Sequence, residues 1–262
     1  MKILITGAAS GIGFNLAVEL AKKNHQVFIT THDDKQLKSV KEKIENYNLL
    51  IVPLKLDITK ENDRNTILKI NPDVLINHAG IGNGGSLLDI SIDVLRDNYE
   101  TNIFASFALL KKYYNFKKKR GEKAKIFVTS SLASMLPIPY LSCYTSSKAA
   151  ISMLVLTLYE ELKVRDDNIS ITLIEPGAYH TGFNQVMIDN KNKFISVDNE
   201  IYEKLDSINK IQRNMFLLIE KNNFTLLIKK IVKEIEKEKP KKIIREPFLQ
   251  SIFAKLYYLF VA

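Results

Sequence analysis

The sequence predicts one α/β domain in which helices cover both faces of a doubly wound parallel sheet. The first observation behind this is the alternation of short, almost wholly apolar runs with longer helical patterns, which is typical of βαβ units. The second is that the first run leads directly into a glycine-rich turn and a helix, over Thr6–Gly13. The third is that 10 glycines and 7 prolines are scattered along 262 residues, which leaves no flexible hinge between domains.

The predicted strands stay apolar nearly throughout, as parallel strands covered on both faces do. They are Lys2–Thr6, Gln26–Thr31, Leu50–Leu56, Val74–Asn77, Ala124–Ser130 and Ser170–Glu175. The predicted helices are Gly13–Lys23, Asp34–Asn46, Ile92–Phe116, Thr145–Lys163 and Phe224–Glu238. The polar segment 184–221 has helical tendency, and we expect it to form a substrate lid over the strand ends. Residues 240–262 form an aromatic C-terminal tail, and the whole chain, 1–262, is predicted to be one domain.

Composition excludes several protein classes. A hydrophobic content of 46% excludes intrinsic disorder, and one cysteine, Cys143, excludes a disulfide framework or a Cys-rich zinc module. We expect no metal site. The first apolar stretch, Ile3–Ile5, enters the glycine turn too early for a signal peptide, and no stretch is long enough to span a bilayer. These observations predict a soluble cytoplasmic protein.

The net charge of +9 raises the question of an anionic partner. The basic runs Lys117–Arg120 and Lys239–Lys242 lie at a helix end and in a turn, and no nucleic-acid-binding motif accompanies them. We therefore interpret them as solvated charge and expect no nucleic-acid partner. A basic surface could instead help to collect an anionic dinucleotide or an acidic carrier protein.

The glycine-rich turn predicts a binding site for a dinucleotide. Gly7 permits a tight turn, Gly11 lets the backbone approach a pyrophosphate, and Gly13 lets the helix pack closely on the sheet. Backbone N–H groups at the helix start would face the anion, so we also expect Ser10 and Ile12 to contact the cofactor. The spacing G-x-x-x-G-x-G departs from the standard fingerprint of the Rossmann-type fold, and an ordinary βα turn is the alternative interpretation.

A second group of residues predicts acid–base chemistry. Tyr144 and Lys148 are four residues apart at a helix start, which places them on one face. A neighbouring ammonium favours the phenolate, so we expect Lys148 to lower the pKa of Tyr144 and to make it a proton donor or acceptor. Ser131, at the carboxyl end of a strand, could hold a substrate carbonyl, with Ser130 as its competitor for that role.

These motifs resemble the short-chain dehydrogenase/reductase family over about Met1 to Phe183. The resemblance rests on T-G-x-x-x-G-x-G, on Asn77-His78-Ala79-Gly80, where the family usually has N-N-A-G, and on Pro176-Gly177 followed by Thr181. It implies that Asn102 seats a water for proton relay, which completes a catalytic set of Asn102, Ser131, Tyr144 and Lys148. It also implies cofactor contacts from Asp57, Ile58, Asn77, Ala79, Gly80, Tyr144, Lys148, Pro176, Gly177 and Thr181. The block ending in Pro176-Gly177 and the tail look like the subgroup that acts on retinoids and hydroxysteroids.

The cofactor is expected to be NADP, with NAD as the alternative. By alignment with the family pattern, Thr31 takes the usual position of the acid that binds the ribose 2′-hydroxyl, and His32 takes the usual position of an arginine. A missing acid and a potential cation favour a 2′-phosphate. Ser10, where many NADP-preferring members have Lys or Arg, and the nearby Asp33 argue in the other direction.

The sequence thus predicts an oxidoreductase that transfers a hydride between a nicotinamide and a carbonyl or secondary alcohol of an apolar small molecule. The alternatives are a 3-oxoacyl carrier-protein reductase and, from another class, a dinucleotide-binding redox sensor without turnover. The helix after Tyr144 is apolar on nearly all faces, and family members often pair through it, so we expect a homodimer or homotetramer. We expect the aromatic tail to pack against the protein or a partner subunit ahead of any peripheral membrane contact.

Overall fold

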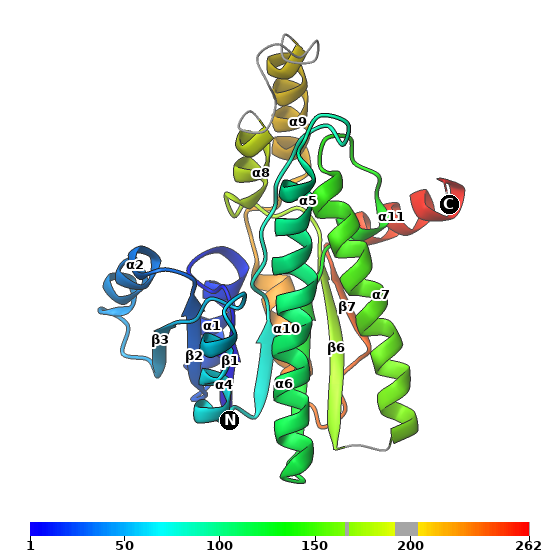
Figure 1. Cartoon of the computed structure of the whole chain (residues 1–262). Helices are drawn as coiled ribbons and strands as arrows, with labels where there is room; N and C mark the ends of the chain where they lie inside the picture. Colours follow the sequence, from blue (N-terminus) through cyan, green and yellow to red (C-terminus); the bar gives the residue numbers. More distant parts are fainter. Residues whose placement is uncertain (166–167, 192–203, 262) are drawn as a thin grey trace.

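A computed structural model describes residues 1–165, 168–191 and 204–261, and it contains one parallel sheet (Figure 1). The strand order is β3-β2-β1-β4-β5-β6-β7, and each neighbouring pair is parallel. The strands are β1 (Lys2–Ile5), β2 (Gln26–Thr31), β3 (Ile51–Lys55), β4 (Val74–Asn77), β5 (Ala124–Thr129), β6 (Ile169–Pro176) and β7 (Ile243–Glu246). The order reverses between β1 and β4, and ligands bind outside the strand ends at such a point in open α/β sheets. The predicted fold class is therefore confirmed.

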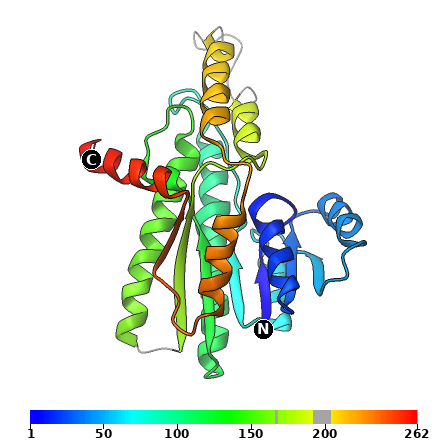
Figure 2. The same ribbon diagram turned by 180° about the vertical axis from the view of Figure 1, so that it is seen from behind.

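Helices cover both faces of the sheet because successive strand residues point to opposite sides. Ile3 and Ile5 pack in a core with α1 (Gly11–Lys22), α2 (Asp34–Ile44) and α10 (Thr225–Glu236), whereas Leu4 packs on the other face. That second core contains residues of α4 (Thr66–Ile70), α6 (Ser106–Lys119) and α7 (Ser142–Arg165). Figure 1 looks at the face with α6 and α7, and Figure 2 shows α1 and α10 on the opposite face.

The six predicted strands are all present with small shifts at their ends. The two edge strands of the sheet, β3 and β7, each have an unusual feature. Pro53 in β3 lacks a backbone N–H, and an edge strand such as β3 tolerates this. The other edge, β7, was not predicted and lies inside the segment interpreted as a tail. Its four residues, Ile-Ile-Arg-Glu, are too few and too polar for a strand pattern, and only its pairing with β6 identifies it.

Three helical predictions need correction or refinement. The helix expected over Ile92–Phe116 consists of α5 (Ile92–Tyr99), a π-helical segment η1 (Glu100–Ala105) and α6. The helix α7 begins at Ser142, before the expected Thr145, and so contains Tyr144. The segment predicted as a lid contains α8 (Phe183–Lys191) and α9 (Leu205–Ile219), while its residues 192–203 lie outside the described part. Short helices α3 (Glu61–Arg64) and η2 (Leu132–Met135, a 3₁₀ turn) complete the connections.

The tail after β7 forms α11 (Phe248–Val261), which stands away from the body of the molecule (Figures 1 and 2). Ser251 and Ala254 are its buried residues, whereas Phe260 is 85% exposed. Most of this helix is therefore not buried against its own chain, and packing of the tail against a partner subunit stays a prediction. Among the described residues, no helix has the length and apolar character that crossing a bilayer requires.

Candidate active site

A cavity of about 1400 Å³ lies at the carboxyl ends of the strands. Its lining comes from the loops after β1 to β6, from the start of α7, and from α8, α9 and α11. Of the residues predicted to form a site, the cavity brings together Gly7, Ser10, Gly11, Ile12, His32, Asp57, Ile58, Ala79, Gly80, Ser131, Tyr144, Lys148, Pro176, Gly177 and Thr181. Gly13, Asn77 and Asn102 lie behind this lining, where they support it.

The glycine turn has the shape that a dinucleotide requires. Gly7 has φ +64° and Gly11 has φ +58°, which are left-handed conformations that favour glycine. A Cβ at Gly7 would lie 2.7 Å from Ala79 Cα, and one at Gly13 would lie 3.0 Å from Ala8 Cα. Ser10 precedes α1 without making a side-chain cap, so the first N–H groups of the helix face the cavity uncapped. The turn therefore fits the pyrophosphate of a bound dinucleotide.

The end of β4 is tied to β1 and α6 by two polar side chains. Thr6 Oγ1 accepts hydrogen bonds from His78 N at 2.9 Å and from Ala79 N at 3.0 Å. Asn77 is buried, and its Nδ2 donates to Ser106 O at 2.8 Å. The Asn77 side chain is thus directed into the protein and shapes the loop, while Ala79 and Gly80 present their surface to the cavity.

Tyr144, Lys148 and Ser131 meet at the centre of the cavity. Lys148 Nζ lies 5.7 Å from the centroid of the Tyr144 ring and donates to Thr129 O at 3.1 Å. Ser131 Oγ accepts from Ala133 N at 3.1 Å, donates to Pro176 O at 3.4 Å, and lies close enough to the Tyr144 phenol to lower its pKa. The spacing of four residues on α7 and the end of β5 therefore bring these three groups to one place, as predicted.

Burial is the main cause of the pKa shifts in this group. It raises the pKa of Tyr144 to about 12, and the hydrogen bond from Ser131 acts in the lowering direction. It also lowers the pKa of Lys148 to about 8. The expectation that Tyr144 has a lowered pKa is therefore wrong, because its pKa is raised. Both shifts favour the neutral forms, because a low-dielectric site disfavours any charge that is not compensated.

Asn102 lies in the π-helical segment η1 and joins three parts of the site. Its Oδ1 accepts from Ile81 N at 2.9 Å, and its Nδ2 lies 2.9 Å from both Ile81 O and Ser147 Oγ. Ser147 Oγ in turn donates to Tyr144 O at 2.8 Å. The extra residue of a π segment often occurs at functional sites, and here the π segment carries the Asn102 that contacts Ser147 of α7.

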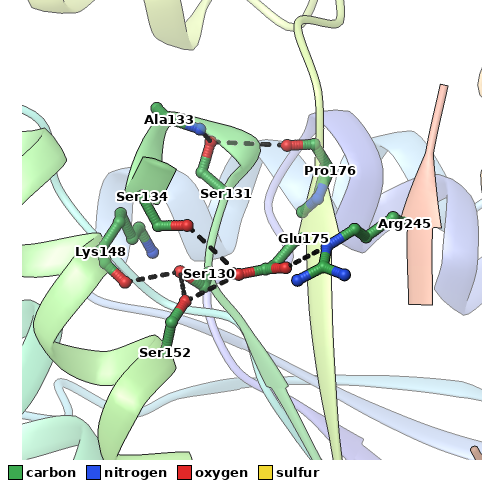
Figure 3. A network of polar contacts seen from close by, with 9 residues as sticks. All are labelled: Ser130, Ser131, Ala133, Ser134, Lys148, Ser152, Glu175, Pro176 and Arg245. Atoms are coloured by element: carbon green, nitrogen blue, oxygen red, sulfur yellow. Dashed lines mark hydrogen bonds and ion pairs between the residues drawn. The ribbon is translucent and has the colours of Figure 1, made fainter. Parts of the chain in front are cut away.

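A buried polar network behind Ser131 was not predicted (Figure 3). The Glu175 carboxylate accepts from Arg245 Nε at 2.6 Å and from Ser134 Oγ at 3.2 Å, and Ser152 Oγ lies 3.0 Å from it. Ser130 Oγ lies 2.7 Å from Ser152 Oγ and donates to Lys148 O at 2.8 Å. Ser130 and Ser131 both line the cavity, but the Ser130 hydroxyl is held in this network. No sequence signal could place Arg245 beside Glu175, because the two residues are 70 positions apart.

Gln250 of α11 is another residue that the sequence did not single out. Its Oε1 accepts from Ala178 N at 2.9 Å, and its Nε2 donates to Ile219 O at 2.7 Å. Gly177 has no side chain, and a Cβ there would collide with Gln250. The loop after β6 is thus held to the ends of both α9 and α11.

The loops after β2 and β3 form the other end of the cavity. Thr31 is fully buried, and its Oγ1 donates to Asp33 O at 3.2 Å. His32 Nε2 lies 3.0 Å from Asp33 Oδ2, and the His32 side chain lines the cavity. Asp57 Oδ1 accepts from Thr59 N at 2.9 Å, and this turn places Ile58 in the wall.

Comparison with known proteins agrees with this geometry. The family model for short chain dehydrogenases matches residues 1–192. The chain belongs to the short-chain dehydrogenase family. Over 223 residues it is 31% identical to a 3-ketodihydrosphingosine reductase of Bacteroides thetaiotaomicron, which covers 81% of this chain and 77% of the relative. It is 30% identical to retinol dehydrogenase 8 of Homo sapiens, over 69% of this chain and 60% of the relative.

A solved structure shares the fold of the whole chain. It is a short-chain dehydrogenase/reductase from Burkholderia phymatum in complex with NAD, with a TM-score of 0.82 at 20% identity, covering 97% of this chain and 92% of that one. The family and the fold together show an NAD(P)-dependent oxidoreductase that acts on alcohols or ketones. Retinol dehydrogenase is among the relatives, which is consistent with the subgroup that the sequence resembles.

Proposed function

We propose that this family member interconverts a ketone and a secondary alcohol on an apolar substrate, with Tyr144 as the proton donor or acceptor. The observation that carries the proposal is the meeting of the Tyr144 phenol, the Ser131 hydroxyl and the Lys148 ammonium in one cavity with the glycine cradle. Acid–base catalysis requires a proton donor within reach of the reacting oxygen, and Tyr144 is the only phenol on the first turn of α7.

Each residue has a distinct part in this mechanism. The bound nicotinamide supplies or accepts the hydride. Ser131 donates a hydrogen bond to the substrate oxygen and holds it beside Tyr144, which donates its phenolic proton as the carbonyl is reduced. Lys148, when protonated, stabilises the phenolate that this transfer leaves behind. Asn102 holds the loop after β4 against α7 and keeps Tyr144 in position, and the proton relay through a water at Asn102 stays a prediction.

The cofactor would be held along the loops of the cavity. Gly7, Gly11 and the uncapped start of α1 would receive the pyrophosphate, and Asp57 and Ile58 would border the adenine. We propose NADP as the preferred form, because Thr31 supplies no carboxylate and His32 could meet a 2′-phosphate. The contact of His32 Nε2 with Asp33 Oδ2 at 3.0 Å would hold the imidazole near that phosphate.

An apolar substrate fits the wall on the other side of Tyr144. Met187 of α8 and Phe216 of α9 pack with Leu141 and Tyr144 in one cluster, and both line the cavity. The Bacteroides reductase and retinol dehydrogenase have substrates with long hydrocarbon portions, which supports the same substrate class here.

The homodimer or homotetramer expected from α7 also stays a proposal, supported by Met153, which is 63% exposed on the outer face of that helix.

The variant Tyr144→Phe tests the mechanism. It should bind NADPH and NADH with nearly the affinity of the native protein, because the phenol is not part of the phosphate cradle, and it should lose about 10²–10⁴-fold in turnover. Nucleotide fluorescence titration and nicotinamide absorbance with a panel of ketones and secondary alcohols give both values. Near-native turnover by Tyr144→Phe would contradict the mechanism, and nucleotide binding without any turnover by the native protein would favour the redox sensor.

A stronger affinity for NADH than for NADPH would overturn the cofactor preference.

A further inference from the structure

The exposed surface of α11 is unusually apolar for a helix that faces solvent. Leu259 is 75% exposed and Phe260 is 85% exposed, and Ile252 and Leu256 lie on the same side of the helix at spacings of three and four residues. In the sequence of α11, Lys255 is the one charged residue. An apolar surface of this kind marks a site of interaction with something outside the chain.

The end of α9 also carries exposed leucines, and it is joined to the start of α11. Leu217 and Leu218 are 69% and 87% exposed, and the hydrogen bond from Gln250 to Ile219 O joins the end of α9 to the start of α11. We call this combined surface the apolar rim, and it consists of Leu217, Leu218, Ile252, Leu256, Leu259 and Phe260. The rim is therefore formed by two helices that the fold holds together.

The apolar rim borders the catalytic cavity. Leu249, Phe253 and Tyr257 of α11 line the cavity, and Met215 and Ile219 of α9 do so as well. Each of the two helices thus contributes side chains both to the cavity and to the rim. A surface in contact with the rim would therefore lie next to residues that line the cavity.

The charges near the rim favour an anionic partner. Lys210, Lys221 and Lys255 are exposed. The nearby carboxylate Glu220 is held by His180 at 2.8 Å and by Asn184 at 2.7 Å, and Asp189 is paired with Arg213 at 2.7 Å. A second copy of the chain on this surface would bring like charges together, whereas anionic lipid headgroups would neutralise them.

We propose that the apolar rim docks on the surface of a bilayer that contains anionic lipids. A helix of 14 residues is about 21 Å long, which is shorter than the apolar core of a bilayer, so α11 would lie at the level of the headgroups. Tyr257 and Tyr258 suit that level, because aromatic rings with a polar end are enriched there. The docked rim would deliver an amphiphilic substrate to the cavity, and this last step rests on the proposed function.

Vesicle flotation tests the docking without any turnover. The native protein should float with vesicles of phosphatidylcholine and phosphatidylglycerol, float less with phosphatidylcholine alone, and lose binding as salt is raised. The double variant Leu256→Ser/Phe260→Ser should bind at least about tenfold more weakly, and Lys255→Gln should bind about fivefold more weakly to the anionic vesicles alone. The control Val164→Ser, at an 88% exposed apolar residue near the far end of α7, should bind like the native protein.

The outcomes separate docking from catalysis. Failure of the native protein to float with anionic vesicles, or equal flotation of the native protein and the double variant, would overturn the docking surface. Size-exclusion chromatography could instead show that the native protein is a dimer and the double variant a monomer. If the native protein also did not bind vesicles, the rim would be an interface with a second copy, and the proposal would be overturned. Flotation of a protein that reduces no carbonyl would support docking and reject the proposed function. Turnover of a water-soluble ketone should be unchanged in the double variant.

Discussion

Arg245 Nε donates to the Glu175 carboxylate at 2.6 Å, and this pair ties β7 to β6 directly behind the two strand-end serines (Figure 3). The Glu175 side chain is 2% exposed and that of Arg245 is 20% exposed. A buried carboxylate is tolerated because its oxygens are satisfied by Arg245, Ser134 and Ser152. The edge strand of the sheet therefore contributes a side chain to the support of the active site.

Removal of the arginine should cost much more stability than removal of a surface partner. Arg245→Met leaves the Glu175 charge buried and unpaired, and we expect the free energy of unfolding to fall by about 3–5 kcal/mol. Urea unfolding monitored by circular dichroism measures this change.

Two further variants show whether the buried charge is the cause. The exposed pair Lys123–Glu238, with side chains 77% and 82% exposed, provides the control, and Lys123→Met should cost less than about 1 kcal/mol. The double variant Glu175→Gln/Arg245→Met should recover most of the loss. Equal effects of Arg245→Met and Lys123→Met would contradict this account.

His78 should make the stability of the protein depend on pH. Burial, with a smaller contribution from the Lys148 charge, lowers the pKa of His78 to about 4, from 6.5 in the unfolded chain. The unfolded state therefore binds more protons between these values, so the stabilisation is complete above pH 6.5 and is lost as the pH falls toward 4. At pH 5.5 we expect a loss of about 1.4 kcal/mol relative to neutral pH.

The matched variant for this measurement is His78→Asn, which places the residue usual in the family at this position. Asparagine does not titrate in this range. Between pH 7.5 and pH 5.5, the unfolding free energy of this variant should therefore fall by about 1.4 kcal/mol less than that of the native protein. Urea unfolding at the two pH values gives the comparison. An unchanged slope in His78→Asn would show that other groups cause the dependence.

Alanine variants of Gly7 and Gly121 distinguish the cost of a strained backbone from the cost of a steric collision. They have nearly the same left-handed conformation, φ +64° and +65°, but a Cβ at Gly7 would lie 2.7 Å from Ala79 Cα, whereas one at Gly121 would meet nothing within 4 Å. Both alanine variants should lose about 1 kcal/mol from the left-handed backbone. Gly7→Ala should lose more stability than Gly121→Ala and should also lose nucleotide binding, because the loop after β4 has to move.

Thermal or urea unfolding and nucleotide titration of both variants test this comparison. Equal stability of the two variants together with intact nucleotide binding by Gly7→Ala would show that the loop yields without consequence. In that case the close approach to Ala79 would not be needed for the phosphate cradle.

The sequence by itself determined the first six strands, their parallel arrangement and most of the residues that meet in the cavity. These features are local: apolar runs and helical spacing depend on near neighbours, and parallel strands with βα turns bring their carboxyl ends to one edge of the sheet. Gly7, Ser131, Tyr144 and Lys148 could be assigned to one site for this reason.

Tertiary structure alone decided the seventh strand, the Glu175–Arg245 pair and the bridge that Gln250 makes between α9 and α11. Each depends on contacts between residues far apart in the chain, which no local pattern records. The direction of the Tyr144 pKa shift was decided in the same way, because burial by packing raises the pKa more than the contact with Ser131 lowers it. The exposure of α11 also belongs here, since an apolar segment is compatible with a buried or an exposed position until the surrounding elements are placed.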